Sequence, residues 1–369
     1  MKTSLHLICL GVESYRHPVL FPYLMREIGK LGWRIASSHA LHTLDPEIPI
    51  RLRQLLEEEG SGPCLIAADP DHFPLAGRVL ATLKGEAMIL SETGTLVPAD
   101  VREVRRDSYL FRFGGRMINV IRIEPGCKLP ELLLEPRLHR SWQLFPETPR
   151  ELERLRRLEL EEPDALDLTE ILPGWIRIES YGASSPTLTL EALYQVTDRV
   201  IPGDSIVEAL ITYLAARKKR ITFAESCTGG LLAATFTAQP GASDILEGSY
   251  VTYANRIKSG WLGVREETLR EHGAVSRECV LEMAAGAQRG LPADIAIAIS
   301  GIAGPTGAVP GKPIGTVYLC LRNGDTVRVE RLQLHGDRNA IQEQSVLYAL
   351  KFLVESEKEK IFKFFSENS

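Results

Sequence analysis

Short apolar runs alternate with amphipathic stretches over the first 145 residues of the chain. The runs Ser4–Leu10, 34–37 and 63–68 have the length and composition of buried strands. Apolar residues recur at helical spacing through Leu20, Leu24 and Ile28, and again over 50–58 and 75–83. Strands that alternate with helices are typical of a parallel sheet covered by helices. Residues 1–145 are therefore predicted to form an α/β sheet domain.

A charged stretch follows this part of the chain. Between Glu151 and Glu159, opposite charges recur at helical spacing with leucines on one side, which predicts an amphipathic connecting helix. Beyond it, 173–180 and 187–193 have the pattern of two short strands. Residues 146–201 are therefore predicted to be a linker and a small module.

The pattern from Pro202 onward predicts a second α/β domain. Strands are expected at 221–225, up to about Tyr253, and at 294–300, 317–321 and 326–334. An amphipathic helix then carries Ile341, Val346, Leu350 and Leu353. The domain is predicted to span 202–358. Residues 359–369 would form a charged tail, whose apolar segment 361–365 could dock on a partner subunit or on the body of its own chain.

Ser226 stands at a predicted corner between a strand and a helix. The strand ends at Glu225, and Gly229 and Gly230 open a helical stretch. A sharp turn of this kind exposes the residue at its corner and leaves backbone N–H groups without partners. Such a corner can present a nucleophile and can stabilise an anion, either a substrate phosphate or an oxyanion. An ordinary strand–turn–helix with a serine or threonine as the helix cap fits the same residues.

Lys258 is the second candidate for chemistry. The helix after Tyr253 is predicted to be capped by Asn255, so that Lys258 falls in its first turn. The positive end of the helix dipole disfavours a charged lysine there, and partial burial would lower the lysine pKa further. Ser226, Tyr253 and a lysine of lowered pKa are a plausible Ser–Lys nucleophilic apparatus. Alternatively, Lys258 extends into solvent and Tyr253 is an ordinary strand aromatic.

A glycine loop and an arginine are candidates for holding a substrate. The loop from Gly301 to Gly307 follows a buried strand, and glycine N–H groups can approach a ligand closely. Arg338 opens the final helix, where its guanidinium could clamp a phosphate through two hydrogen bonds. Alternatively, Arg338 pairs with Asp337 or Glu343 on the surface.

Composition narrows the class of protein. A formal net charge of -5 and an isoelectric point near 6.0 disfavour a general nucleic-acid-binding protein. The six cysteines lie far apart without a C-x-x-C pair, which disfavours a zinc site and a disulfide framework and indicates a reducing cytosol. No run reaches the roughly 18 apolar residues of a membrane helix. Cys227 is expected to be a small buried residue rather than the nucleophile.

Six motifs carry a family resemblance. In chain order they are AESCTGG, VTYANRIK, HGAVS, ISGIAGP, KPIGTV and HGDR, between about Ile206 and Glu355. Together they resemble the C-terminal domain of the CinA family, which includes nicotinamide mononucleotide deamidases. The resemblance implies a three-layer α/β fold and hydrolysis of the nicotinamide amide to a carboxylate and ammonia. It also implies that Ser226 is the nucleophile, that Lys258 is the base and that Tyr253 assists proton transfer or positioning.

The resemblance extends the expectations to substrate and assembly. We expect a cytoplasmic homodimer that acts on a small nucleotide without a metal or organic cofactor, with no nucleic-acid or membrane partner. Backbone N–H groups from Cys227 to Gly230 would hold the oxyanion. The residues predicted to contact substrate are Cys227, Thr228, Gly229, Gly230, Ser300, Gly301, Gly304, Thr316 and Arg338.

The first half of the chain resembles, more faintly, the MoaB-like N-terminal domain of long CinA proteins. In some members of the family this domain is associated with ADP-ribose pyrophosphatase activity. The shared traces are Gly11-Val12-Glu13, Gly94-Thr95 and the segment 124–132. Residues 146–201 resemble the KH-like module that joins the domains in relatives. That module has no visible GXXG loop here, so RNA binding is not expected.

The glycine loop of the MoaB-like domain should fall near 67–74, where this chain has Asp69-Pro70-Asp71-His72-Phe73-Pro74. Proline lacks the N–H that a phosphate cradle needs, so the pyrophosphatase site is predicted to be lost. Asp69, Asp71 and His72 could be offered as metal ligands, but a solvated loop is favoured. Two alternatives to the amidohydrolase stay open. One is a non-catalytic nucleotide-binding or regulatory protein, and the other is a competence- or damage-associated interaction protein.

Overall fold

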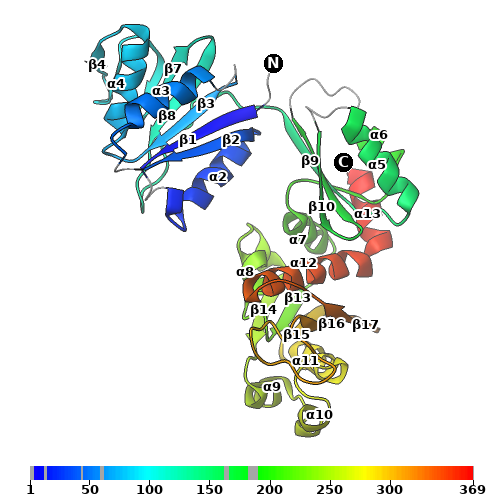
Figure 1. The fold of residues 1–369 in the computed structure, drawn as a ribbon. Helices are drawn as coiled ribbons and strands as arrows, with labels where there is room; N and C mark the ends of the chain where they lie inside the picture. Colours follow the sequence, from blue (N-terminus) through cyan, green and yellow to red (C-terminus); the bar gives the residue numbers. More distant parts are fainter. Residues whose placement is uncertain are drawn as a thin grey trace. The chain divides into compact units, whose positions relative to one another are not determined.

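The computed structural model describes residues 4–11, 15–42, 45–58, 62–161, 166–181 and 190–368. The chain divides into two compact units, which Figure 1 shows in ribbon form. Unit 1 comprises Met1–Arg140, Leu158–Asp167 and Glu179–Leu188, and unit 2 comprises Ser141–Arg157, Leu168–Ile178 and Thr189–Ser369. Among the described residues, no helix is both long and apolar enough to cross a membrane.

A six-stranded sheet in the order β2-β1-β3-β8-β7-β6 forms the centre of unit 1. Its strands are β1 (Ser4–Leu10), β2 (Arg34–Leu41), β3 (Cys64–Ala68), β6 (Val101–Arg105), β7 (Ser108–Phe113) and β8 (Arg116–Arg122). The first four in this order, β2 to β8, pair in parallel, whereas β7 and β6 add antiparallel neighbours. A small hairpin of β4 (Met88–Leu90) and β5 (Leu96–Pro98) completes the strands of this unit.

Helices cover both faces of this sheet. In β1, Ile8 and Leu10 pack with α3 (Ile48–Glu58) and α4 (Phe73–Lys84). The alternate residues of the strand, Leu7 and Cys9, pack with α2 (Leu20–Lys30) on the other face. A strand buried on both faces has no polar alternation, which explains the continuous apolar runs in the sequence.

The segment 67–74 is compact rather than an open loop. His72 is buried, and its Nδ1 lies 2.7 Å from Oδ1 of Asp69, which also accepts the backbone N–H of His72 at 2.9 Å. The helix α4 begins directly afterwards at Phe73. The prediction of a solvated loop is therefore wrong for His72, because this short turn folds back on itself. Of the MoaB-like traces, Val12 and Glu13 lie outside the described residues.

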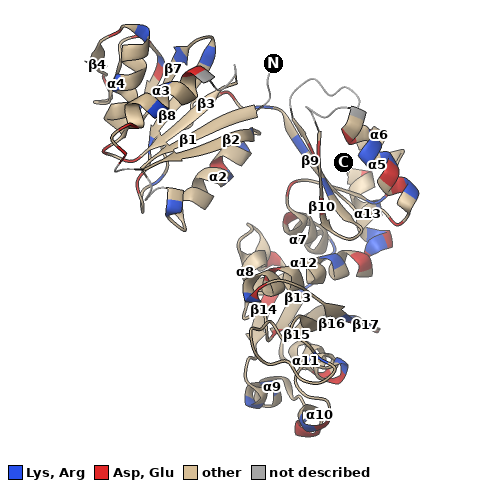
Figure 2. Ribbon diagram, viewed as in Figure 1, with Lys and Arg blue, Asp and Glu red and all other residues tan. Residues whose placement is uncertain are grey.

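The middle of the chain forms a four-stranded sheet in the order β10-β11-β9-β12. Its strands are β9 (His139–Leu144), β10 (Leu166–Leu172), β11 (Trp175–Tyr181) and β12 (Val200–Pro202). The predicted amphipathic helix is confirmed as α5 (Pro149–Glu161), along which Figure 2 shows basic and acidic residues interleaved. The strand predicted at 187–193 is wrong, since Leu190–Tyr194 is helix α6 and 187–189 lie outside the described residues. Leu190 and Leu193 are three residues apart, which suits a single helical turn.

Unit 2 also contains a five-stranded sheet in the order β14-β13-β15-β16-β17. The strands are β13 (Ile221–Glu225), β14 (Leu246–Val251), β15 (Ile295–Gly301), β16 (Thr316–Asn323) and β17 (Thr326–Gln333). The strands β14, β13 and β15 run parallel, and β16 and β17 are antiparallel additions. The helices of this part are α7 (Ile206–Ala216), α8 (Leu231–Thr237), η1 (Ala242–Asp244), α9 (Asn255–Leu262), α10 (Glu266–Glu271), α11 (Arg277–Gly290), α12 (Arg338–Ser356) and α13 (Lys358–Asn368).

Side-chain size differs between the two faces of this sheet. In β15, the residues Ile295, Ile297 and Ile299 face the core that includes α7, α8 and α12. Ala296 and Ala298 face α11, and their small size lets that helix lie close to the strands. The helices on both faces give a three-layer arrangement, and the α/β fold class is confirmed (Figure 1).

The residues predicted as a charged tail form helix α13. Ile361 is fully buried, and Phe362 packs against Phe145 with 5.7 Å between ring centroids. Phe364 meets Tyr213 edge-on at 5.5 Å. This segment was expected to dock either on a partner subunit or on the body of its own chain. In the structure it packs onto its own unit.

Candidate active site

Ser226 directly follows the last residue of β13. Its backbone N–H donates to the carbonyl of Ile299 on β15 at 3.0 Å, which fixes the residue to the end of the sheet. Its side chain is largely buried, with 8% of the residue exposed. Helix α8 begins later, at Leu231, and its cap is Gly230 with a positive φ of 100°. Ser226 is therefore at the end of the strand, and the alternative in which a serine or threonine caps the helix is wrong.

A side chain of the protein itself accepts the backbone N–H groups at the N-terminus of α8. The fully buried carboxylate of Glu225 accepts the backbone N–H groups of Gly230, Leu232 and Ala233 at 3.0–3.1 Å. It also accepts the hydroxyls of Thr228 at 2.8 Å and Ser249 at 3.2 Å. A helix N-terminus stabilises negative charge, and here that charge comes from within the chain.

This arrangement reduces the number of backbone N–H groups that are available to bind an oxyanion. The N–H of Gly229 donates to the carbonyl of Ser226 at 3.2 Å, and that of Gly230 donates to Glu225. In this loop, the backbone N–H groups of Cys227 and Thr228 have no backbone acceptor among the described residues. The expectation for Gly229 and Gly230 is therefore wrong, because internal acceptors already use their donors.

Lys258 reaches Ser226 from helix α9. The residue is 1% exposed, and its Nζ lies within hydrogen-bond distance, 2.9 Å, of Oγ of Ser226. The same nitrogen donates to the carbonyls of Thr252 at 2.7 Å and Tyr253 at 3.1 Å. The helix begins one residue earlier than predicted, because Ala254 is its cap and Asn255 is its first residue. The predicted pairing of Ser226 and Lys258 is present.

The environment of Lys258 favours its neutral form. Burial holds the pKa of Lys258 below its ordinary value, although the nearby thiols of Cys279 and Cys227 act in the opposite direction when ionised. Burial raises the pKa of Cys279 to about 11 and that of Cys227 to about 12. Both thiols are therefore uncharged near neutral pH and give the lysine no counter-charge. The same raised pKa supports the prediction that Cys227 is not the nucleophile.

The geometry around Nζ fits a neutral amine. A neutral amine has two N–H donors and one lone pair, and three partners surround this nitrogen. The two carbonyls, of Thr252 and Tyr253, can accept both N–H groups, which leaves the lone pair for the hydroxyl of Ser226. In this neutral form, the lone pair of Lys258 can accept the serine proton.

Tyr253 contributes to this site through its main chain. Its side chain is exposed (63%), and its hydroxyl accepts a hydrogen bond from Arg338 at 3.0 Å. Arg338 also donates to the carbonyl of Gly304 at 2.7 Å. The alternative in which Arg338 pairs with Asp337 or Glu343 is wrong, since Asp337 instead caps α12 by accepting the N–H of Ala340 at 2.8 Å. Arg338 and Tyr253 thus form an exposed polar pair, which the carbonyl of the buried Gly304 anchors.

Two predicted substrate contacts have internal partners. Ser300 is fully buried, and its hydroxyl donates to the carbonyl of Ala274 at 2.7 Å. Thr316 is also fully buried, and its hydroxyl donates to Gln333 at 3.2 Å. A side chain at Gly301 would meet Val317 at 2.7 Å, so this glycine is needed for packing. The hydroxyls of Ser300 and Thr316 therefore have internal partners, Gly301 allows close packing against Val317, and contact of these residues with substrate stays a prediction.

The sequence prediction missed Gln342 and the role of Glu225. Gln342 donates from α12 to the carbonyl of Cys227 at 2.6 Å. Arg338 and Gln342 are four residues apart and so share one face of the helix, a spacing that links them in the sequence as well. An acidic residue inside an otherwise apolar strand end was the available signal for Glu225.

Comparisons with known proteins cover the part of the chain that contains this site. The sequence of residues 203–356 matches the protein-family model of the CinA C-terminal domain. A CinA-like protein of Thermotoga neapolitana is 44% identical over 174 residues, which cover 47% of this chain and 41% of that protein. The chain therefore spans about two fifths of that relative's length. The nicotinamide-nucleotide amidohydrolase PncC of Pseudomonas putida is 44% identical over 154 residues, 42% of this chain and 96% of PncC.

Solved structures are similar over the same region. The competence damage-inducible protein A (ComA) of Klebsiella pneumoniae is 41% identical and covers 41% of this chain and 93% of its own, with a TM-score of 0.40. The resemblance predicted from the six motifs is confirmed. The chain belongs to the CinA family through its C-terminal domain.

Proposed function

We propose that the C-terminal domain is an amidohydrolase that converts nicotinamide mononucleotide into nicotinate mononucleotide and ammonia. The observation that carries the proposal is the buried contact of 2.9 Å between Nζ of Lys258 and Oγ of Ser226. A lysine of lowered pKa beside a serine is the arrangement needed to activate a hydroxyl nucleophile. The substrate is proposed by analogy with PncC, whose sequence is covered almost completely by this domain.

In the proposed reaction, the hydroxyl proton of Ser226 passes to neutral Lys258 while Oγ bonds to the carboxamide carbon. The carbonyl oxygen becomes an oxyanion, which the N–H groups of Cys227 and Thr228 stabilise. The C–N bond then breaks, and the leaving nitrogen takes the proton from Lys258 and departs as ammonia. A water molecule gives one proton to Lys258 and attacks the ester, and Ser226 recovers that proton from Lys258 as the ester C–O bond breaks. The carboxylic acid releases its remaining proton to solvent and leaves as the carboxylate.

The phosphate end of the substrate is assigned to the exposed polar pair of Arg338 and Tyr253. Among the described residues, the guanidinium of Arg338 contacts a carbonyl and a phenol and no carboxylate, so that its positive charge is available to an anion. Its charge also acts on Cys227, the neighbour of the nucleophile. An anion bound at Arg338 therefore lies within electrostatic range of the reacting centre.

The N-terminal half is proposed to have lost the pyrophosphatase activity of its relatives. The Asp69 carboxylate already accepts from His72, and no group of three metal-ligating side chains occurs among the described residues. A role for this half as a scaffold or dimerisation surface stays a prediction. The test is incubation of the full chain with ADP-ribose and magnesium or manganese, where product formation that Asp69→Ala abolishes would refute the loss.

Ammonia release from nicotinamide mononucleotide by the purified full chain tests the amidohydrolase. The alternative, a non-catalytic nucleotide-binding protein, predicts binding of the nucleotide without ammonia. Ser226→Ala is the matched control, because it removes the nucleophile and leaves the groups assigned to binding in place. Turnover by the wild type that Ser226→Ala loses would support the proposal, and binding without turnover by the wild type would favour the alternative.

A further inference from the structure

A groove with a volume of about 520 Å³ lies within unit 2, and none of its lining residues belongs to the Ser226–Lys258 site. Its walls come from the end of β9, the turn before β11, the segment before β12, strand β17 and helices α12 and α13. This volume is in the range of small-molecule sites in proteins. A second, smaller hollow of about 290 Å³ shares Arg199, Lys358 and Phe362 with it.

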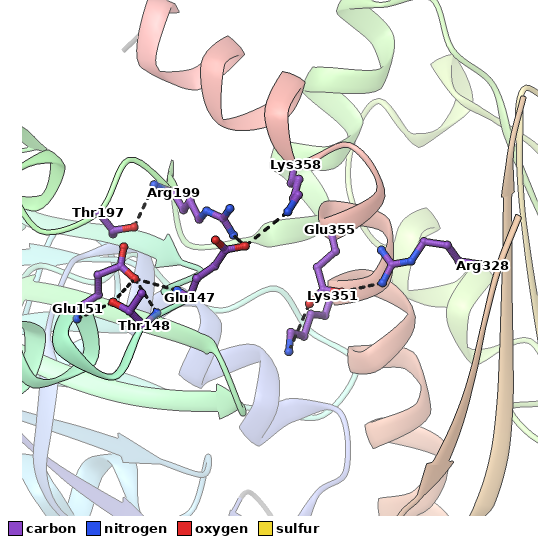
Figure 3. A network of polar contacts seen from close by, with 9 residues as sticks. All are labelled: Glu147, Thr148, Glu151, Thr197, Arg199, Arg328, Lys351, Glu355 and Lys358. Atoms are coloured by element: carbon purple, nitrogen blue, oxygen red, sulfur yellow. Dashed lines mark hydrogen bonds and ion pairs between the residues drawn. The ribbon is translucent and has the colours of Figure 1, made fainter. Parts of the chain in front are cut away.

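The groove has an excess of positive charge. Four cationic side chains line it against two carboxylates, and each carboxylate is shared by two cations (Figure 3). Glu147 pairs with Arg199 and, at 3.5 Å, with Lys358. Glu355 pairs with Arg328 at 3.4 Å and with Lys351 at 3.5 Å. The residues that line the groove therefore carry two more positive than negative charges, in a chain whose net charge is negative.

Aromatic rings line the groove and hold its arginines. The rings of Phe145 and Phe362 lie among the lining residues with centroids 5.7 Å apart. The guanidinium of Arg328 lies 4.5 Å above the ring of Phe352, and that of Arg199 lies 5.9 Å above Phe362. Stacking of this kind orients a guanidinium in advance, which reduces the entropy lost when it binds an anion.

We propose that this groove binds an organic phosphate of mononucleotide size. A phosphate monoester carries close to two negative charges, which matches the charge excess of the groove. Two preoriented arginines and two lysines supply the donors that phosphate oxygens accept. The apolar wall of Phe145 and Phe362 then takes the ring of the ligand. The small volume favours a single nucleotide over a polymer.

Adenosine 5′-monophosphate is the probe, titrated into the full chain by calorimetry. The decisive variant is Lys351→Gln with Lys358→Gln, which removes both excess charges. It leaves Glu147 with Arg199 and Glu355 with Arg328, so that no carboxylate loses all its partners. Losing one charge-assisted hydrogen bond or more should weaken binding at least about tenfold. Lys360→Gln on α13 is the control, since it removes the same charge outside the groove.

Arg338→Gln separates this groove from the proposed amidase site. The inference predicts that adenosine 5′-monophosphate binding survives in Arg338→Gln and is lost in the double lysine variant. Adenosine without phosphate should not bind, and inorganic phosphate should bind more weakly than the nucleotide. Should the double variant unfold, Lys358→Gln alone gives the same test, because this side chain is 46% exposed.

Three results would overturn the inference. They are the absence of binding to the wild type, equal binding of adenosine, and loss of binding in Arg338→Gln with retention in the double lysine variant. None of these results bears on ammonia release, so the proposed amidohydrolase would stand or fall separately.

Discussion

The guanidinium of Arg338 donates to the hydroxyl of Tyr253 at 3.0 Å, while the carbonyl of the same tyrosine accepts from Lys258 at 3.1 Å. Tyr253 thus contacts the proposed phosphate-binding residue, Arg338, through its hydroxyl, and the proposed base, Lys258, through its carbonyl. Its phenol is exposed and has its contact with Arg338. The phenol is therefore assigned to substrate positioning and not to proton transfer.

Tyr253→Phe should consequently be a mild substitution. The loss of one exposed hydrogen bond costs about 1 kcal/mol, so kcat/KM should fall about fivefold. The fall should come from KM, since the carbonyl that contacts Lys258 is unchanged. Steady-state kinetics with nicotinamide mononucleotide gives both parameters. A decrease of several orders of magnitude in kcat would instead make the phenol a proton carrier.

Gln342 should act as a positioning residue for the loop after Ser226. Gln342→Ala removes the donor to the Cys227 carbonyl and frees the peptide that carries the proposed oxyanion N–H groups. We expect kcat to fall about tenfold, consistent with the loss of one buried hydrogen bond, and KM to change little. Gln344→Ala is the control. Gln344 lies on the same helix as Gln342 but donates to the carbonyls of His335 and Ala340, away from the loop after Ser226. Equal effects of the two variants on kcat would refute the assignment.

Glu225 should be required for stability. Glu225→Ala leaves three backbone N–H groups at the start of α8 and two hydroxyls without their acceptor. Unpaired buried donors cost about 1–3 kcal/mol each, so the free energy of unfolding should fall by about 3 kcal/mol or more. Denaturant unfolding measures it, with the exposed Glu266→Ala as control. A change below about 1 kcal/mol would show that the carboxylate is not the cap of this helix.

The local chemistry of the site could be predicted from sequence more readily than its long-range contacts. Ser226 and Lys258 were found because a strand end and the helix that follows the next strand are local patterns. The partners of Ser300 and Thr316, Ala274 and Gln333, could not be predicted because they are distant in sequence. The position of the carboxylate of Glu225 depends on how the backbone turns at Gly230, which residue types alone do not fix.

For the fold as well, local sequence patterns were easier to predict than long-range contacts. Strands buried on both faces, such as β1 and β15, were recognised from their uninterrupted apolar runs. The segment 187–193 was misassigned in its described part, because a single turn of helix has too few residues to show a period. Docking of α13 through Ile361 could not be decided from composition, since the apolar segment suits either a partner or its own unit.

Stability should respond to pH through Lys258. The unfolded lysine has a pKa of about 10.4, whereas the folded pKa is lowered by burial. Between these two values the unfolded state binds more protons, so the stability of the folded state rises with pH in that window. Lys258→Met removes this dependence. Urea unfolding of both proteins at several pH values should show the wild type gaining stability relative to the variant as pH rises, and a constant difference would contradict the lowered pKa.

The most direct test of the central claim is the pH dependence of ammonia release by the wild type, Ser226→Ala and Lys258→Arg. The proposal predicts that wild-type kcat/KM rises with pH as Lys258 loses its proton. Both variants should lose several orders of magnitude in turnover while still folding, because the first lacks the nucleophile and the guanidinium of the second stays protonated and cannot act as the base. Substantial ammonia release by Lys258→Arg, or a flat wild-type profile with chemistry rate-limiting, would contradict the Ser226–Lys258 mechanism.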